Sequence, residues 1–264
     1  MDKQDTQLDH ELTKRLTEAL TAGSEALFQL ILDPNLDVVT ACLKNRQLSD
    51  DHLLALLKRR DLPEELVARI YRRCSKALSH KLVLALVKNP ATPGQIVRKL
   101  LPQLHLFELV DVCFMPGATP DQRLAAERTL IQRLPTTPLG NKLTLARRAT
   151  TNVVAELLKE GQPALLEACL NSPRLQEAAI FQFLNGPHAS AETISMIARH
   201  SRWCQRPNLR MAILKNSRTP AIWFTLWLPR LPLPIIKQLL FGQRTNPKQK
   251  HLITEELQRR GATR

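Results

Sequence analysis

The sequence predicts an all-α protein, an α-solenoid of about 16–18 short helices built from a tandem duplication of about 127 residues. Shifting the chain by 127 positions aligns residues 35–134 with residues 162–261 without a gap, and about 22 of roughly 100 aligned positions are identical. Apolar residues make up 44% of the chain and aromatic residues only 4%, so Leu and Ala supply most of the core. The 18 prolines outnumber the 8 glycines, which favours proline-started helices over glycine-rich strand turns.

Within each copy a shorter unit recurs, in which an apolar helix end is followed by Lys-Asn-x-x-Thr-Pro or a variant of it. The Asn follows the last apolar turn, and Asn tolerates the left-handed conformation of a helix C-cap. The Thr offers an N-cap hydroxyl, and the Pro suits the first position of the next helix. The prediction applies to Asn89, Thr92 and Pro93, to Thr119 and Pro120, and to Asn216, Thr219 and Pro220.

The segments 88–93 and 215–220, followed by Leu-Leu-Pro and Trp-Leu-Pro, resemble the repeats of HEAT-like α-solenoids. In particular they are similar to the leucine-rich-repeat-variant type of short helical repeat. The resemblance covers most of residues 35–261 and implies a superhelix of paired helices. Members of the variant type can hold an iron–sulfur cluster on a group of cysteines, but the five cysteines here do not cluster in sequence. We therefore predict no cofactor and no metal site.

Three of those cysteines, Cys42, Cys113 and Cys169, occupy equivalent positions of the short unit, where other versions have Leu86 and Ile213. A position that accepts Cys, Leu or Ile is a packing position, so these thiols are expected in the core. They are expected to be reduced, as in the cytoplasm.

The predicted organisation has three parts. Residues 1–34 form an acidic N-terminal helical cap, because a terminal repeat needs a polar outer face. Residues 35–161 form the first copy and residues 162–264 the second, joined as one continuous solenoid. Residues 222–241 are the one segment apolar enough to suggest a membrane span, but Arg230, Lys237 and three prolines argue against it. No signal peptide is apparent, and a cytoplasmic location is expected.

Positive charge is unevenly distributed. The formal net charge is +14, and the surplus lies in residues 44–99 and 199–264, which contain equivalent parts of the two copies, whereas residues 1–43 are acidic. Such a surplus predicts a polyanionic partner, either an acidic protein surface or nucleic acid, with anionic lipid a further possibility. The alternative is a solvated surface that only keeps a Leu-rich repeat protein soluble. No small-molecule substrate is inferred.

One segment is a sharper candidate for anion binding. Arginines surround Trp203 just before Pro207, which is predicted to begin a helix, and a cation there opposes the helix dipole. A placement unfavourable for stability indicates anion binding, although the arginines could equally be solvated with their stems over the indole. The candidate residues are Arg199, Arg202, Trp203, Arg206 and Arg210, with Arg72 and Lys76 as counterparts in the first copy.

Trp223 and Trp227 stand four residues apart on one predicted helix, where the first copy has Ile96 and Leu100. Such a pair packs in the core or forms exposed aromatic anchors. A base-stacking platform is the remote third interpretation.

No motif of an enzyme is present: the sequence has no phosphate loop, no dinucleotide fingerprint, no His-Glu-x-x-His helix and no nucleophile elbow. We therefore predict a non-enzymatic binding or scaffold protein that presents a basic surface to an acidic partner. One enzyme class stays open, the HEAT-like alkylpurine DNA glycosylases, which combine tryptophans, arginines and a carboxylate in a concave basic groove. An acidic side chain beside exposed tryptophan faces would identify it.

Overall fold

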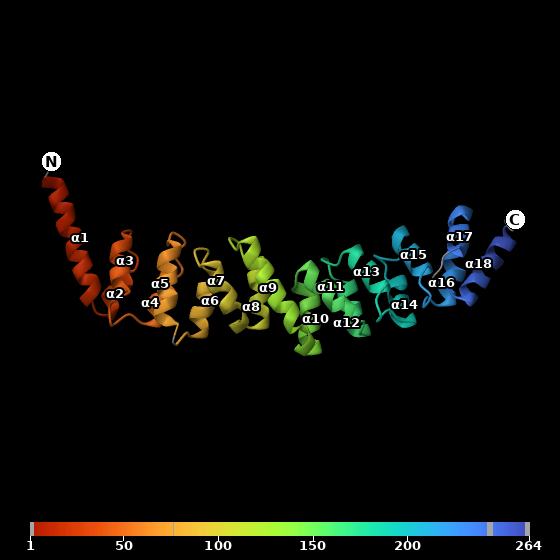
Figure 1. Ribbon diagram of the computed structural model, residues 1–264, viewed down its shortest axis with the longest axis horizontal. Coiled ribbons are helices and arrows are strands. Elements are labelled where there is room, and N and C mark those ends of the chain that lie inside the picture. The colour runs from red at the N-terminus through yellow and green to blue at the C-terminus, as the bar shows by residue number, and fades with distance from the viewer. Residues whose placement is uncertain (1–2, 76, 242–244, 262–264) are drawn as a thin grey trace. The chain divides into compact units, whose positions relative to one another are not determined.

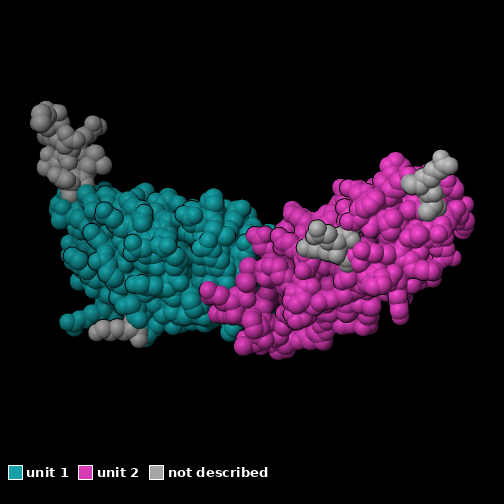
Figure 2. Space-filling model, turned by 45° about the vertical axis from the view of Figure 1, so that its right-hand side comes forward, with its two compact units in different colours: residues 1–130 teal, residues 131–264 magenta. Residues whose placement is uncertain are grey.

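A computed structural model describes residues 3–75, 77–241 and 245–261. Every regular element in these residues is a helix: there are 18 α-helices, most of seven to nine residues, and three 3₁₀ turns. The all-α prediction is confirmed. The chain divides into two compact units, residues 1–130 and 131–264, each described here on its own (Figures 1 and 2).

In unit 1 successive helices pack side by side along the chain (Figure 1). Helices α2, α4, α6 and α8 contact one another in turn, and α1 contacts α3. Helix α9 crosses the boundary between the units. The elements are α1 (Lys3–Thr21), α2 (Ser24–Leu30), α3 (Leu36–Cys42), α4 (Asp50–Leu56), α5 (Glu64–Cys74), α6 (His80–Lys88), α7 (Gly94–Leu100), η1 (Leu101–Gln103), α8 (Leu106–Phe114) and α9 (Pro120–Arg133).

Unit 2 is built in the same way. Helices α11, α13 and α15 contact one another in turn, as do α10, α12 and α14. The elements are η2 (Leu134–Thr136), α10 (Leu139–Arg148), α11 (Thr151–Lys159), α12 (Pro163–Leu170), α13 (Glu177–Leu184), α14 (Ala191–Arg199), α15 (Pro207–Leu214), α16 (Ala221–Trp227), η3 (Leu228–Arg230), α17 (Leu233–Leu240) and α18 (Pro247–Arg259).

The element boundaries repeat with the same offset of 127 residues as the sequence. The elements α3 to α9, with η1, begin at residues 36, 50, 64, 80, 94, 101, 106 and 120, and α12 to α18, with η3, begin at 163, 177, 191, 207, 221, 228, 233 and 247. The offset also holds before residue 35, because α2 and α11 begin at residues 24 and 151.

Three asparagine side chains, two buried and one half-buried, join a helical pair to the preceding one. The amide of each donates to carbonyl oxygens at or just after the end of a helix about 30 residues earlier, and its Oδ1 accepts from a backbone N–H two residues later. The long-range bonds run from Asn45 to Ala19 and Ala22 (both 3.0 Å), from Asn89 to Leu57 (2.8 Å) and Arg59 (2.9 Å), and from Asn216 to Leu184 (2.6 Å).

The left-handed conformation predicted for Asn89 and Asn216 is wrong. Asn89 has φ −80° and ψ 124°, and no non-glycine residue in the described chain has a positive φ. The side-chain amide of Asn89 instead donates to the carbonyl oxygens of Leu57 and Arg59, which follow the short helix α4 and have no partner within it. The contact recurs in the second copy: Asn89 bonds to Leu57, and Asn216 bonds to Leu184, each residue 127 positions later.

The threonines of the unit divide into two kinds. Thr119 is an N-cap as predicted: its hydroxyl accepts from the Gln122 N–H, while Gln122 accepts from the Thr119 N–H. The N-cap prediction is wrong for Thr92 and Thr219, whose hydroxyls instead donate back to the carbonyls of Leu86 and Ile213. Both hydroxyls thus bond to carbonyls near the end of the preceding helix. Pro93 and Pro220, predicted at the first helical position, instead stand at the N-cap of α7 and α16.

The segment 222–241, examined above as a possible span, is divided among α16, η3 and α17. Among the described residues, no helix combines the length and apolar character needed to cross a bilayer.

Cys42, Cys113 and Cys169 are buried in the core, with exposed fractions of 0%, 6% and 0%. Burial, with a smaller contribution from a nearby carboxylate, raises the pKa of Cys42 to about 11 and the pKa values of Cys113 and Cys169 to about 12. Burial also raises the pKa of Cys74. All five cysteines are unpaired, and only Cys204 is partly accessible.

The Asn89→Ala variant should be destabilised by about 2–4 kcal/mol, because the buried carbonyls of Leu57 and Arg59 lose their donor and the Ala91 N–H loses its acceptor. Urea unfolding followed by circular dichroism measures the loss. Gln95→Ala, at an exposed position of α7, is the control and should stay within about 0.5 kcal/mol of the parent. An Asn89→Ala cost as small as the control would show that the bridges are dispensable.

Thiol labelling of the folded protein at pH 8 should modify Cys204 alone. A thiol with a pKa of about 11 is ionised in about one molecule in a thousand at that pH, and burial blocks the reagent as well. Ellman's reagent should count one thiol in buffer and five in denaturant. Rapid modification of Cys113 or Cys169 without denaturant would contradict the buried core described here.

Candidate functional site

Unit 1 contains a surface groove between α4 and α6, which we call groove 1, with a volume of about 650 Å³. Its floor consists of half-buried apolar side chains, and its rim is formed by exposed charged ones. The residues that line it include Leu54, Ala55, Leu84 and Ala85 on the floor and Asp51, Lys58, Arg60, Lys81 and Lys88 on the rim.

The helical period explains this arrangement. Lys81, Leu84, Ala85 and Lys88 lie at positions i, i+3, i+4 and i+7 of α6, so they share one face. The opposite face of α6 holds buried apolar residues such as Leu82 and Leu86, and it fixes the helix against the core. The lysines are therefore presented to solvent beside an apolar floor.

Unit 2 contains the equivalent groove between α13 and α15, groove 2, with a volume of about 880 Å³. Phe181 takes the place of Leu54, Met211 that of Leu84, and Lys215 that of Lys88, each 127 residues on. Groove 2 is less charged, because Asn185 and Asn208 stand where groove 1 has Lys58 and Lys81.

Two of the arginines predicted to bind an anion are held in backbone contacts. Arg202 donates to the carbonyls of Ser172 (2.8 Å) and Leu175 (3.3 Å), and its guanidinium lies 4.3 Å from the centroid of the Trp203 ring. Arg210 donates through Nε to the carbonyl of Cys204. Both arginines thus satisfy carbonyl oxygens of unit 2.

The other predicted anion-binding residues are not brought into one cluster. Arg199 is the exposed last residue of α14, and Arg206 is the exposed N-cap of α15 with no capping side-chain bond. In unit 1 Arg72 donates within its own helix to the Ala68 carbonyl at 3.3 Å. Lys76 lies outside the described residues.

All three tryptophans are buried. Trp203 is 2% exposed and donates through Nε1 to the Leu170 carbonyl at 3.0 Å. Trp223 and Trp227 are each 8% exposed, with ring centroids 5.2 Å apart, and the Trp223 indole donates to Ser195 Oγ at 3.0 Å. Trp223 and Trp227 therefore pack in the core and are not exposed anchors.

Sequence reasoning missed the groove lysines Lys58, Lys81 and Lys88. The spacing of two of them was available in the sequence, since Lys81 and Lys88 are seven residues apart on one helix face with Leu84 and Ala85 between them. That signal is weak, because any amphipathic helix carries exposed lysines. These lysines differ from other exposed lysines because helix α4 forms the other side of a groove beside them.

Comparison with known proteins adds no relative: no family model, no curated protein and no solved structure matches this chain.

Replacing Arg202 with Ala should lower the free energy of unfolding by about 1–2 kcal/mol, because two carbonyl oxygens lose a charged donor. Arg206→Ala, at an exposed position without such bonds, is the matched control and should change it by less than about 0.5 kcal/mol. Thermal and urea unfolding measure both. Equal and negligible effects would leave Arg202 free to bind a ligand.

Proposed function

We propose that this chain is a non-enzymatic binding protein, a HEAT-like α-solenoid derived from a tandem duplication, whose basic groove holds an extended acidic segment of a partner protein. The carrying observation is the pair of grooves at equivalent positions, one of them rimmed by four basic side chains and a single acidic one. The common offset of the helix starts supports the duplication.

The chemistry of groove 1 indicates the kind of segment. Half-buried Leu54 and Leu84 offer apolar contact, and Lys58, Lys81 and Lys88 attract carboxylates at its edge. A peptide that alternates acidic and apolar side chains satisfies both features. The proposal includes a reducing compartment such as the cytoplasm, which five unpaired thiols favour.

Nucleic acid is the alternative partner, and the net charge of +14 is its support. Binding of single strands usually relies on aromatic rings that stack on bases, whereas all three tryptophans of this chain are buried. The same burial disfavours the DNA glycosylase alternative, which needs tryptophan faces open to a groove. The apolar floor of groove 1 also suits amino-acid side chains better than phosphates.

Reversal of three groove charges tests the proposal. The variant Lys58→Glu/Lys81→Glu/Lys88→Glu should bind a fluorescent 12-residue peptide of alternating Glu and Leu at least about tenfold more weakly than the parent, because attraction becomes repulsion. The control Lys44→Glu/Arg69→Glu/Lys99→Glu makes the same charge change at exposed positions of unit 1 outside the groove. It should weaken binding by less than about threefold. Fluorescence anisotropy at 150 mM salt measures both.

Two outcomes would contradict the proposal. Equal losses from the two triple variants would mean that diffuse charge, not the groove, attracts the peptide. A single-stranded DNA 12-mer that binds more tightly than the peptide, and loses affinity with the groove variant, would assign the groove to nucleic acid.

A further inference from the structure

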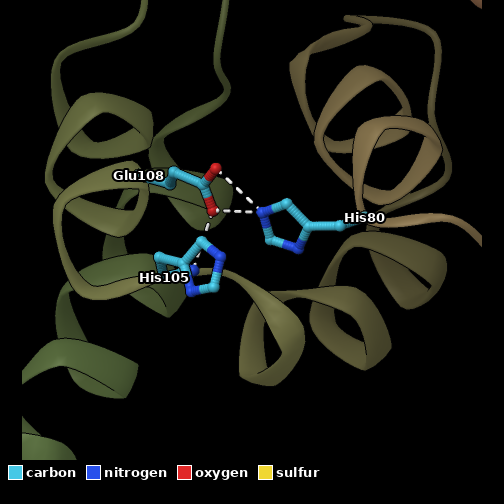
Figure 3. A group of neighbouring side chains, drawn as sticks. All are labelled: His80, His105 and Glu108. Carbon is cyan, nitrogen blue, oxygen red and sulfur yellow. Dashed lines mark hydrogen bonds and ion pairs between the residues drawn. The ribbon is translucent and has the colours of Figure 1, made fainter.

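A cluster of three metal-ligating side chains lies in unit 1, apart from groove 1: His80, His105 and Glu108 (Figure 3). His80 Nε2 lies 2.9 Å from each carboxylate oxygen of Glu108, and the two imidazole ring centroids are 4.2 Å apart. One ligand atom from each residue falls within 4.8 Å of the others. Both histidines are exposed and Glu108 is partly buried, so an ion has access from solvent.

The fold holds these three side chains together through two neighbouring helices. His80 is the first residue of α6, whereas His105 is the N-cap of α8 and Glu108 its third residue. Glu108 also accepts from the backbone N–H of His105 at 2.8 Å in a capping box, which fixes its carboxylate. The contact of α6 with α8 brings His80 to the other side of that carboxylate.

We propose that His80, His105 and Glu108 form a binding site for one divalent transition-metal ion of the zinc class. Zinc bonds of about 2.0–2.2 Å in a tetrahedron separate the ligand atoms by about 3.4 Å. His80 Nε2 lies 2.9 Å from the Glu108 oxygens, and no two of the three ligand atoms are more than 4.8 Å apart. Small rotations of the imidazole rings therefore bring three ligands to one ion. The ion takes the place of the proton that His80 Nε2 donates to Glu108, and a fourth coordination position stays open to water.

The ligand set selects the metal. Two imidazole nitrogens and one carboxylate suit zinc and its neighbours, whereas magnesium and calcium prefer oxygen ligands alone. The cluster also lies at the N-termini of α6 and α8, where the helix dipoles repel cations. A cation attracted only by the charge of Glu108 is therefore disfavoured relative to one that forms bonds with the imidazole nitrogens.

The equivalent positions of unit 2 provide an internal comparison. There Pro207, Pro232 and Ile235 stand where unit 1 has His80, His105 and Glu108. All three replacements lack a ligand atom, while the helices α15 and α17 still begin at the corresponding residues. The fold therefore does not need these side chains to start its helices. The cluster is a property of unit 1 and is independent of the partner proposed for groove 1.

Calorimetric titration of the full chain with zinc chloride tests the site. The protein should bind one Zn²⁺ with a Kd of about 10 µM or tighter, should bind Co²⁺ with the visible absorption of a four-coordinate ion, and should not respond to Mg²⁺ or Ca²⁺. Zinc should also raise its melting temperature, because the ion binds only the folded arrangement.

Three single variants should each weaken zinc binding at least tenfold and remove the cobalt spectrum: His80→Gln, His105→Asn and Glu108→Gln. The last two keep a side chain able to cap α8, so the helix still forms. His188→Gln and His251→Gln, at exposed positions of unit 2, are controls and should bind as the parent does. Stoichiometric zinc binding that survives Glu108→Gln and His105→Asn, no binding by the parent, or equal binding of Mg²⁺ would overturn the proposal.

Discussion

The constraint on which this structure depends is the supply of hydrogen-bond donors to the carbonyl oxygens at helix ends. A helix leaves its last four carbonyls without partners inside the helix. Most helices here have only seven to nine residues, so such carbonyls make up a large share of the backbone. Buried carbonyls without donors would cost more than the helices contribute. The chain meets this demand with side chains from the next helical pair, about 30 residues later.

Asparagine is suited to this task because one amide offers two donors and one acceptor. The Asn89 amide donates to two carbonyls of the preceding helical pair, and its Oδ1 accepts from the Ala91 N–H in its own loop. Arginine does similar work where its guanidinium fork can reach two carbonyls: Arg73 donates to Leu43 and Asn45, and Arg260 donates to Leu228 and Leu231. Part of the positive charge of the chain is thus used in holding the fold.

That use of arginine separates what the sequence could predict from what it could not. The helix starts were predictable, because proline and the 127-residue repeat mark them at Pro120 and Pro247. The role of Arg202 was not, since an arginine near a tryptophan and a helix start has the same local pattern whether it binds a ligand or a carbonyl. Asn89 was misjudged for the same reason: its partners, Leu57 and Arg59, are distant in sequence.

The candidate site residues were even less predictable from local sequence patterns. His80 and His105 are separated by a helix, a loop and a second helix, and the spacing matches no metal-binding motif. Only the packing of α6 against α8 places His80 on the Glu108 carboxylate and beside the His105 ring. Groove 1 is similar, because its lysines become a rim only when α4 lies beside α6.

Comparison of the two units shows which positions the fold constrains. The contact of Asn89 with Leu57 is kept by Asn216 with Leu184, and the hydroxyl contact of Thr92 by Thr219. Ser172 stands in place of Asn45, and its buried hydroxyl makes no such bridge. The surface residues differ freely: Lys58 and Lys81 become Asn185 and Asn208. Charge lost at exposed positions costs little stability, so the grooves were able to diverge. The asparagine bridge is kept at Asn89 and Asn216 but not at the position of Asn45. Groove 2 therefore has only two charged lining residues, Lys215 and Arg218, whereas groove 1 has five.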